Sequence, residues 1–374
     1  MTSSPITVES RFTALVRLRP RHRAACADLT RRRRALQVAL GLIWLLDAAL
    51  QFQPYMFTKA FVSQVIQPGA AGNPAVIADP ITWSADLMAS HIVVFNALFA
   101  SIQLLLAAGL LYRPTAKVAL AASIPWALGV WWIGEGLGGL LTGTGNPLTG
   151  APGAAILYVF LALLAWPTAS PADAPGPESA SHTEGESVAT TGWLGPVTPR
   201  IAWAGLWGSY AISVLQSADR APGALGGILA GMRAGEPGWV SAIDGVLARL
   251  MAHLGAEVSV AIAVLCAVAV ATVALRRATS STSSTRTSVA SVASVAGRLG
   301  VLVAAAVGTV IWIIEDFGGI LTGQGTDPNT GLLLIVIAAA FWPLAAPANA
   351  DRPDAASRSQ LAAVTTVAPA DQFL

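Results

Sequence analysis

The chain contains the stretch WIGEGLGGLLTGTG at residues 132–145 and repeats it, with few changes, as WIIEDFGGILTGQG at residues 312–325. In both copies an apolar run leads into an acidic residue, Glu135 or Glu315, and a Gly-Gly pair follows shortly after. A correspondence over this length is hard to obtain by chance. It predicts a chain made of two related halves.

The similarity extends outward from this motif over both halves. Trp-Pro pairs close the two copies, at Trp166-Pro167 and Trp342-Pro343. The offset between the copies grows along the chain because the second copy holds an additional Ser/Thr tract around residues 280–291. The matches indicate duplication and fusion of one unit. Further matched positions are Trp44 with Trp207, Leu87-Met88-Ala89 with Leu250-Met251-Ala252, and Arg113 with Arg276.

The composition indicates a membrane protein. Of the 374 residues, 54% are hydrophobic and 11% are charged, and the mean hydropathy is +0.62. Soluble domains carry roughly 25% charged residues, so this chain lacks the polar surface that a water-soluble protein needs. The formal net charge of +2 is too small to favour a nucleic acid as partner. The predicted partner is the lipid bilayer.

Long apolar segments predict an all-α integral membrane fold with about eight transmembrane helices. A helix needs roughly 20 apolar residues to cross the hydrocarbon. Positively charged loops face the cytoplasm. The basic segments at residues 31–34, 113–117 and 276–298 all lie on the cytoplasmic side if the chain has about eight spans and both termini are cytoplasmic. Copies with an even number of spans share one orientation, so we expect two tandem four-helix repeats in parallel orientation. The predicted spans are residues 35–53, 91–112, 117–138, 151–167, 200–217, 256–275, 298–318 and 330–346.

The expected organisation has five parts. Residues 1–34 form a basic cytoplasmic N-terminal tail, and the two membrane repeats occupy residues 35–167 and 200–346. Residues 168–199 between them are rich in Pro, Ala, Ser, Thr and Glu, which is typical of a disordered linker, here on the cytoplasmic side. Residues 347–374 have the same character and form a cytoplasmic C-terminal tail.

Two kinds of chemistry are disfavoured by the sequence. Cys26 lies in the basic tail and Cys266 in an apolar run, so a disulfide between them is not expected, and no C-x-x-C pair suggests dithiol chemistry. The Gly-rich motif is not a phosphate loop, because no lysine follows its glycines and the motif is expected on the outer side of the membrane.

The two motif glutamates are candidates for a functional site. The predicted spans place Glu135 and Glu315 near the outer ends of the third and seventh helices. A carboxylate at membrane depth is costly unless it is paired, hydrated or protonated, so such residues usually serve a function. The alternative is a tight turn whose polar atoms only satisfy local backbone groups. The motif loops comprise Gly138, Gly139, Thr142, Gly143 and Gly145, and Gly318, Gly319, Thr322, Gly323 and Gly325.

Asp47 is a further candidate because it lies well inside the first predicted span. Intramembrane acids commonly carry protons or bind cationic groups. Gln51 follows one turn later on the same face, whereas Tyr210 occupies the place of Asp47 in the second half. The competing interpretation is a structural hydrogen bond across helices, to Asn96 or Gln103.

The sequence also offers residues for an outer metal or proton site. His91 and His253 begin the second and sixth predicted spans, and Asp316 and the motif glutamates lie on the same side. Only His253 and Glu257 have the helical spacing of a metal motif, and a lone interfacial histidine is usually solvated. Neither histidine lies in mid-span with a partner, as a haem would need. We therefore predict no bound metal.

Each half resembles the DoxX-like group of small four-span membrane proteins. The whole chain resembles duplicated membrane proteins of high-GC Gram-positive bacteria, in which a Glu-x-x-Gly-Gly-x-Leu-Thr-Gly stretch recurs. The resemblance covers both membrane halves but neither the tails nor the linker. It implies the bacterial inner membrane. Some DoxX-like members are subunits of quinone-linked oxidoreductases or of membrane redox complexes, and no catalytic residue is carried over from them.

Two functional hypotheses follow. The first is an accessory membrane subunit attached to a quinone-linked redox complex, with a quinone and other membrane subunits as partners. The second is a transporter or channel for small solutes or ions, with the motif loops as an entry site and Asp47 inside the helix bundle. A membrane enzyme has the least support, since the sequence shows no nucleophile–base pair and no metal motif.

Overall fold

The computed structural model describes residues 8–143, 145–168, 187–216, 220–233, 236–254, 256–278 and 286–343. Within these residues every regular element is helical and there is no β-strand, which confirms the predicted all-α class. The chain divides into a body of residues 22–344 and a second unit of residues 1–21 and 345–374. Of the second unit only residues 8–21, the start of the first helix, are described.

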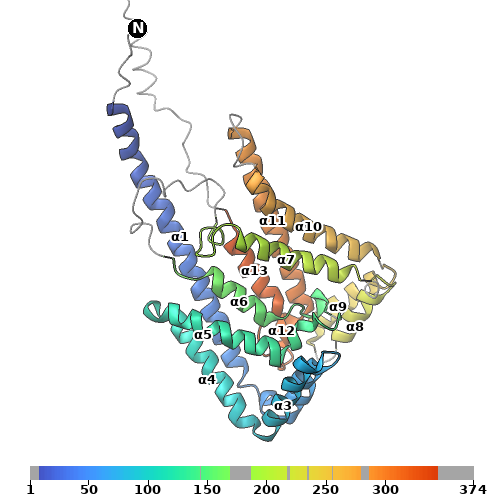
Figure 1. The fold of residues 1–374 in the computed structure, drawn as a ribbon. Helices are drawn as coiled ribbons and strands as arrows, with labels where there is room; N and C mark the ends of the chain where they lie inside the picture. Colours follow the sequence, from blue (N-terminus) through green and yellow to red (C-terminus); the bar gives the residue numbers. More distant parts are fainter. Residues whose placement is uncertain are drawn as a thin grey trace, which may run out of the picture. The chain divides into compact units, whose positions relative to one another are not determined.

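The first half of the body contains five longer helices joined by short helical turns (Figure 1). The fourth of them, α5, continues as the π-helical turn Val130–Gly134, which ends directly before Glu135. π-helical turns often occur at functional sites. The helices are α1 (Val8–Leu50), α3 (Ala75–Ser90), α4 (Ile92–Leu111), α5 (Ala116–Gly129) and α6 (Ala154–Leu164). The short turns between α1 and α3 are η1 (Pro54–Phe57), α2 (Lys59–Phe61), η2 (Val62–Ile66) and η3 (Gln67–Ala70). The later turns are η4 (Arg113–Thr115), η6 (Gly136–Gly139) and η7 (Pro147–Thr149).

The described residues of the second half are also helical. A first helix is followed by two shorter ones, and then by three that lead through the second motif to the end of the body (Figure 1). These helices are α7 (Thr198–Val214), α8 (Ala224–Met232), α9 (Gly238–Met251), α10 (Ala256–Ala278), α11 (Arg286–Ile314), the single turn α12 (Asp316–Gly319) and α13 (Asn329–Ala340).

The helices of each half pack in a matching order. In the first half α4 contacts α5 and α5 contacts α6, and in the second α10 contacts α11 and α11 contacts α13. The last helices of the two halves, α6 and α13, also pack against each other. Phe160 and Phe341 meet there with ring centroids 6.5 Å apart. One buried apolar core therefore runs through both halves.

Among the described residues, three helical segments are long and apolar enough to cross a membrane: Ile92–Leu111, Arg113–Gly134 and Val295–Ile314. The number is four if α9 and α10, which are bent by 110° at their break, form one broken span. Each of the eight predicted spans overlaps a helix, but α6 and α13 have only 11 and 12 residues. The number of eight spans stays a prediction.

The described end of the predicted linker packs on the body. The amide of Ala189 donates to the carbonyl oxygen of Ala340, the last residue of α13, at 3.0 Å. The Arg33 side chain of α1 donates to Thr168 Oγ1 at 2.6 Å and to the Thr191 carbonyl at 3.4 Å. These bonds hold the start and the described end of the linker beside α1. Residues 169–186 lie outside the described part of the chain.

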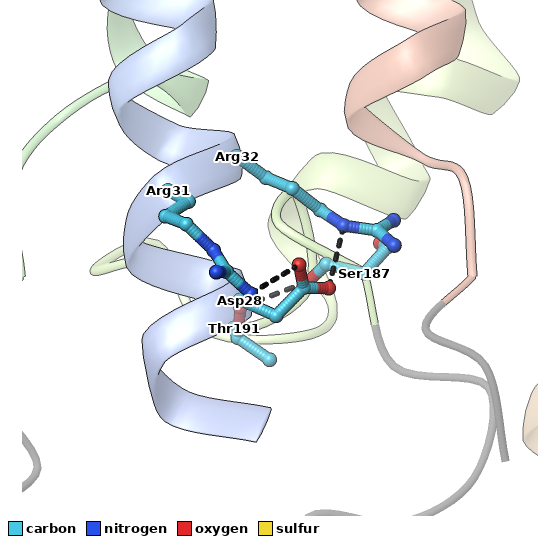
Figure 2. A network of polar contacts seen from close by, with 5 residues as sticks. All are labelled: Asp28, Arg31, Arg32, Ser187 and Thr191. Carbon is cyan, nitrogen blue, oxygen red and sulfur yellow. Dashed lines mark hydrogen bonds and ion pairs between the residues drawn. The ribbon is translucent and has the colours of Figure 1, made fainter. Parts of the chain in front are cut away.

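Figure 2 shows polar side chains of α1 and of the described end of the linker beside it. Asp28 forms ion pairs with Arg31 at 3.5 Å and with Arg32 at 2.8 Å, within one turn of the helix. The Thr191 hydroxyl donates to the Ser187 carbonyl at 2.9 Å. Ion pairs of this kind on an accessible helix surface contribute only about 0.2–0.5 kcal/mol each. They support the local helix and do not form a site.

Candidate functional site

The two motif stretches fold into the same tight turn. Left-handed backbone is costly for residues with a side chain, which explains the density of glycines. In each turn a threonine hydroxyl donates to the carbonyl of the second paired glycine, at 2.9 Å and 2.8 Å. Positive φ angles occur at Gly136, Leu137, Gly138, Gly139 and Gly143, between 55° and 70°, and at Asp316, Phe317, Gly318, Gly319 and Gly323, between 49° and 82°.

Backbone passes directly over the first glycine of each Gly-Gly pair. A Cβ atom on Gly138 would collide with the Pro152 carbonyl, and one on Gly318 would collide with the Asp327 carbonyl. Glycine is therefore required at both positions for the turn to close. The tight turn considered as the alternative interpretation is present, but the motif glutamates reach beyond it.

Each motif glutamate binds the start of the helix that follows its turn. Glu135 accepts a hydrogen bond from the Ala155 amide at 3.0 Å, at the beginning of α6. Glu315 accepts from the Thr330 hydroxyl at 2.9 Å and from the Gly331 amide at 3.4 Å, at the beginning of α13. A carboxylate is stabilised there by the free amides and by the helix dipole. Both glutamates thus cap a helix, and Glu135 also faces a cavity.

A cavity of about 510 Å³ lies beside Asp47 and Glu135 in the first half. Its wall is mostly apolar and rich in aromatic rings, so we call it the apolar cavity. Phe99 and Trp126 stand with ring centroids 5.6 Å apart, and Phe95 and Phe99 with centroids 6.1 Å apart. The aromatic residues that line it are Trp44, Phe61, Trp83, Phe95, Phe99, Trp126 and Tyr158.

Several buried polar atoms in the wall of the apolar cavity have no hydrogen-bond partner among the described residues. Burying such an atom unpaired costs about 1–3 kcal/mol, so its presence needs an explanation. One explanation is a bound ligand that supplies the missing hydrogen-bond partners. The atoms are the acceptors Asp47 Oδ1, Gln51 Oε1 and Gln103 Oε1 and the donors Trp44 Nε1 and Trp126 Nε1.

A second cavity of about 400 Å³ adjoins the first. We call it the polar cavity, because polar atoms form most of its surface. Its wall comes mainly from the first motif turn and from the segments 65–73 and 149–154, and the second half adds Gly318, Thr326, Asp327 and Asn329. The Asn73 side-chain amide ties that segment to the first turn by donating to the Gly136 carbonyl at 3.3 Å. The two cavities share five lining residues: Val65, Gly134, Glu135, Thr326 and Asp327.

Asp327 brings the second half of the chain into this site. Its carboxylate accepts from the Thr326 hydroxyl at 2.8 Å and from the Asn329 amide at 2.7 Å. Burial raises the pKa of Asp327 above its ordinary value, and these two hydrogen bonds partly offset that rise. Its charge also acts on Asp47 and Glu135. Three carboxyl groups from two halves of the chain therefore lie around the two cavities.

Asp47 is held by a residue that the sequence did not single out. Tyr158 of α6 donates to Asp47 Oδ2 at 2.7 Å. The partners expected from the sequence make other contacts: the Asn96 side-chain amide donates to the Gln51 carbonyl at 2.6 Å, while Gln103 lines the cavity. The structural hydrogen bond is therefore present, but its donor is a tyrosine.

The other predicted site residues lie apart from the cavities. Glu315 and Asp316 line neither of them. Asp316 is buried and interacts electrostatically with Asp244. His91 is exposed and bonded to the neighbouring Ser90 hydroxyl at 2.8 Å. In the described part of the chain no three His, Cys, Asp or Glu side chains lie close enough to hold a metal, and this includes His253 and Glu257.

Three residues of this site were not singled out by the sequence: Trp44, Trp126 and Tyr158. Asp327 had a visible signal, because it follows the second motif directly and offers side-chain oxygens for a polar pocket. The aromatic residues had none, since tryptophan and tyrosine near helix ends are ordinary in membrane proteins. Comparison of the chain with protein-family models, with curated proteins and with solved structures found no match.

Proposed function

We propose that this chain is a multi-pass protein of the bacterial inner membrane that binds a small solute in the apolar cavity and carries it across the bilayer. The observation that carries the proposal is the apolar cavity with its unpaired buried polar atoms, Asp47 Oδ1 among them. An apolar pocket with a few convergent polar groups is the usual form of a small-molecule site. The adjoining polar cavity, which shares five lining residues with it, is the proposed approach to this site.

Two tandem four-helix repeats in parallel orientation, with cytoplasmic termini, are part of the proposal. Equivalent contacts in the two halves support it. The Glu135–Ala155 and Glu315–Gly331 bonds join corresponding positions, because Ala155 and Gly331 stand equally far before the two Trp-Pro pairs. Parallel repeats are a known arrangement of transporters, with the solute site near the middle of the membrane.

A steric block tests the solute site. Gly129 lines the apolar cavity, and a Cβ atom there would meet no other atom within 4 Å. Gly129→Leu is therefore expected to fill the cavity without disturbing the helix. Gly205→Leu on α7 is the matched control, because Gly205 has equally open surroundings and lines neither cavity.

The measurement is uptake into proteoliposomes of labelled apolar solutes of three kinds: cationic, neutral and anionic. We expect uptake of at least one kind, lost in Gly129→Leu and kept in Gly205→Leu. Transport by the protein is refuted if no solute enters faster than into empty liposomes. The location of the site is refuted if both variants transport equally well.

A quinone is a second candidate occupant, in line with an accessory subunit of a quinone-linked redox complex. The observation in its favour is the pair of unpaired indole N–H groups, Trp44 Nε1 and Trp126 Nε1, which suit the carbonyl oxygens of a quinone. Mass spectrometry of lipid extracts tests it. Quinone should copurify with the unmodified protein and Gly205→Leu but be depleted in Gly129→Leu.

A further inference from the structure

We propose that the solute of the apolar cavity is a protonated primary or secondary amine with an aromatic or branched apolar body, and that its ammonium group binds Asp47. The proposal rests on the solute cavity put forward above and names the chemical class of its occupant.

The charge of the site favours a cation. Asp47, Glu135 and Asp327 are among the lining residues of the two cavities, and within the described part of the chain no Lys, Arg or His side chain lines either of them. An anionic solute would meet carboxyl groups with no described cation to offset them. An ammonium ion supplies the opposite charge that a buried carboxylate needs.

The free acceptors favour an ammonium group that carries hydrogen. Asp47 Oδ1 and Gln51 Oε1 both lack a hydrogen-bond partner among the described residues, and the two residues lie one turn apart on the same face of α1. Both side chains are more than nine-tenths buried and line the same cavity. Two N–H donors of a primary or secondary ammonium satisfy both atoms, whereas a quaternary ammonium has no N–H and leaves both unpaired.

Tyr158 positions the carboxyl group for this contact. Its hydroxyl donates a hydrogen bond to Asp47 Oδ2 at 2.7 Å, so Asp47 Oδ1 remains to accept a hydrogen bond from a ligand. The Trp44 ring packs on Tyr158 with centroids 4.5 Å apart. Aromatic faces next to a carboxylate also attract cations through the charge distribution of the ring. The head of the ligand therefore meets a carboxylate and aromatic rings together.

The remainder of the cavity suits an apolar body. Phe95, Phe99 and Trp126 form a continuous set of ring contacts along its wall. A flexible polar chain would lose its hydration there without gaining hydrogen bonds. An aromatic or branched apolar group gains burial instead, at about 25 cal/mol for each Å² of apolar surface.

The second half lacks a corresponding binding site for an ammonium group. Tyr210 stands where the first half has Asp47, and Leu334 stands where it has Tyr158, counted from the Trp-Pro pairs. Tyr210 and Leu334 are buried in the common core. One amine per chain is the expected stoichiometry, although the motif is present twice.

Four probes that differ only in their head group test this inference. They are 4-phenylbutylamine, 4-phenylbutan-1-ol, 4-phenylbutyltrimethylammonium and 5-phenylpentanoate. Each is titrated calorimetrically into the full chain in nanodiscs of phosphatidylcholine, with empty nanodiscs as blank. The amine should bind at one per chain and at least about tenfold more tightly than the alcohol, since a charge-assisted hydrogen bond replaces a neutral one. The trimethylammonium probe should bind more weakly than the amine.

Variants locate the head group. Asp47→Asn should reduce the preference for amine over alcohol about tenfold and leave the affinity for the alcohol nearly unchanged. Asp244→Asn is the matched control, because Asp244 is also a buried acid but lines neither cavity. Gln51→Leu serves as a second variant that removes a head-group acceptor, in case Asp47→Asn does not fold.

The outcomes separate the two proposals. If the alcohol or the anion binds as tightly as the amine, or if Asp47→Asn keeps the amine preference, the amine assignment is wrong while the solute cavity stands. If none of the four probes binds, both proposals fail. Equal affinity of the amine and trimethylammonium probes would overturn the requirement for N–H donors. Binding of two amines per chain would overturn the single site.

Discussion

Tyr158 donates a hydrogen bond of 2.7 Å from its hydroxyl to Asp47 Oδ2, and both residues are buried. This bond joins α6 to α1 and leaves one carboxyl oxygen of Asp47 without a described partner. A buried acid that is half satisfied is costly, and the cost is usually tolerated at sites that bind ligands.

Removal of the Tyr158 hydroxyl should destabilise the protein. Tyr158→Phe leaves both oxygens of Asp47 unpaired, which costs about 1–3 kcal/mol in the free energy of unfolding. The expected result is a lower Tm in detergent, measured by differential scanning fluorimetry. Tyr112→Phe is the control, because Tyr112 is 64% exposed. Equal Tm values for the two variants would show that the hydrogen bond contributes nothing.

The two motif glutamates should differ in their contribution to stability. Glu135→Ala removes a cap at the start of α6 and should cost about 1 kcal/mol. Glu315→Ala should cost more, because it also leaves the buried Thr330 hydroxyl without its acceptor. A double-mutant cycle of Glu315→Ala with Thr330→Val measures that coupling through Tm or chemical unfolding. Strict additivity would argue against the hydrogen bond.

Alanine should not be tolerated at the first glycine of either Gly-Gly pair. Gly138→Ala and Gly318→Ala each force a side chain into left-handed backbone and against a carbonyl group. The expected cost is more than about 2 kcal/mol for each. Gly129→Ala, in a helix with open space around it, should be neutral or slightly stabilising. Folded yield and Tm of the three variants give the comparison, and a normal Tm for Gly138→Ala contradicts the turn.

Glu236 should make stability depend on pH. Burial and the neighbouring Asp244 raise the pKa of Glu236 from an ordinary value of 4.5 to about 7. The folded chain then binds the proton more tightly than the unfolded chain does. The contribution of this proton is complete below about pH 4.5 and is lost as the pH rises towards 7.

Glu236→Gln tests this expectation. The variant cannot titrate, so its Tm should vary less with pH between 4.5 and 7 than the Tm of the unmodified protein. A Tm profile of Glu236→Gln that runs parallel to that of the unmodified protein would contradict the raised pKa.

Much of the fold was predictable because it depends on local sequence. The helical class follows from long apolar segments, and every predicted span overlaps a helix of the structure. The tight turn was foreseeable from the glycines of the motif, which allow positive φ angles. The capping of helices by Glu135 and Glu315 could not be foreseen, because each glutamate binds an amide far along the chain. Ala155 lies 20 residues after Glu135, and Gly331 lies 16 residues after Glu315.

The sequence by itself determined that the chain is helical and largely apolar and that its glycine-rich motifs form tight turns. Hydropathy and glycine spacing act between residues that are close together in the chain, so both are visible in the sequence. Only the tertiary structure decided that Asp327 of the second half belongs with Asp47 and Glu135 of the first. That association depends on the packing of α6 against α13 and on the direction in which each turn leaves its helix. Contacts between residues so far apart in the chain have no local signal, so the composition of the site emerges only when the helices pack.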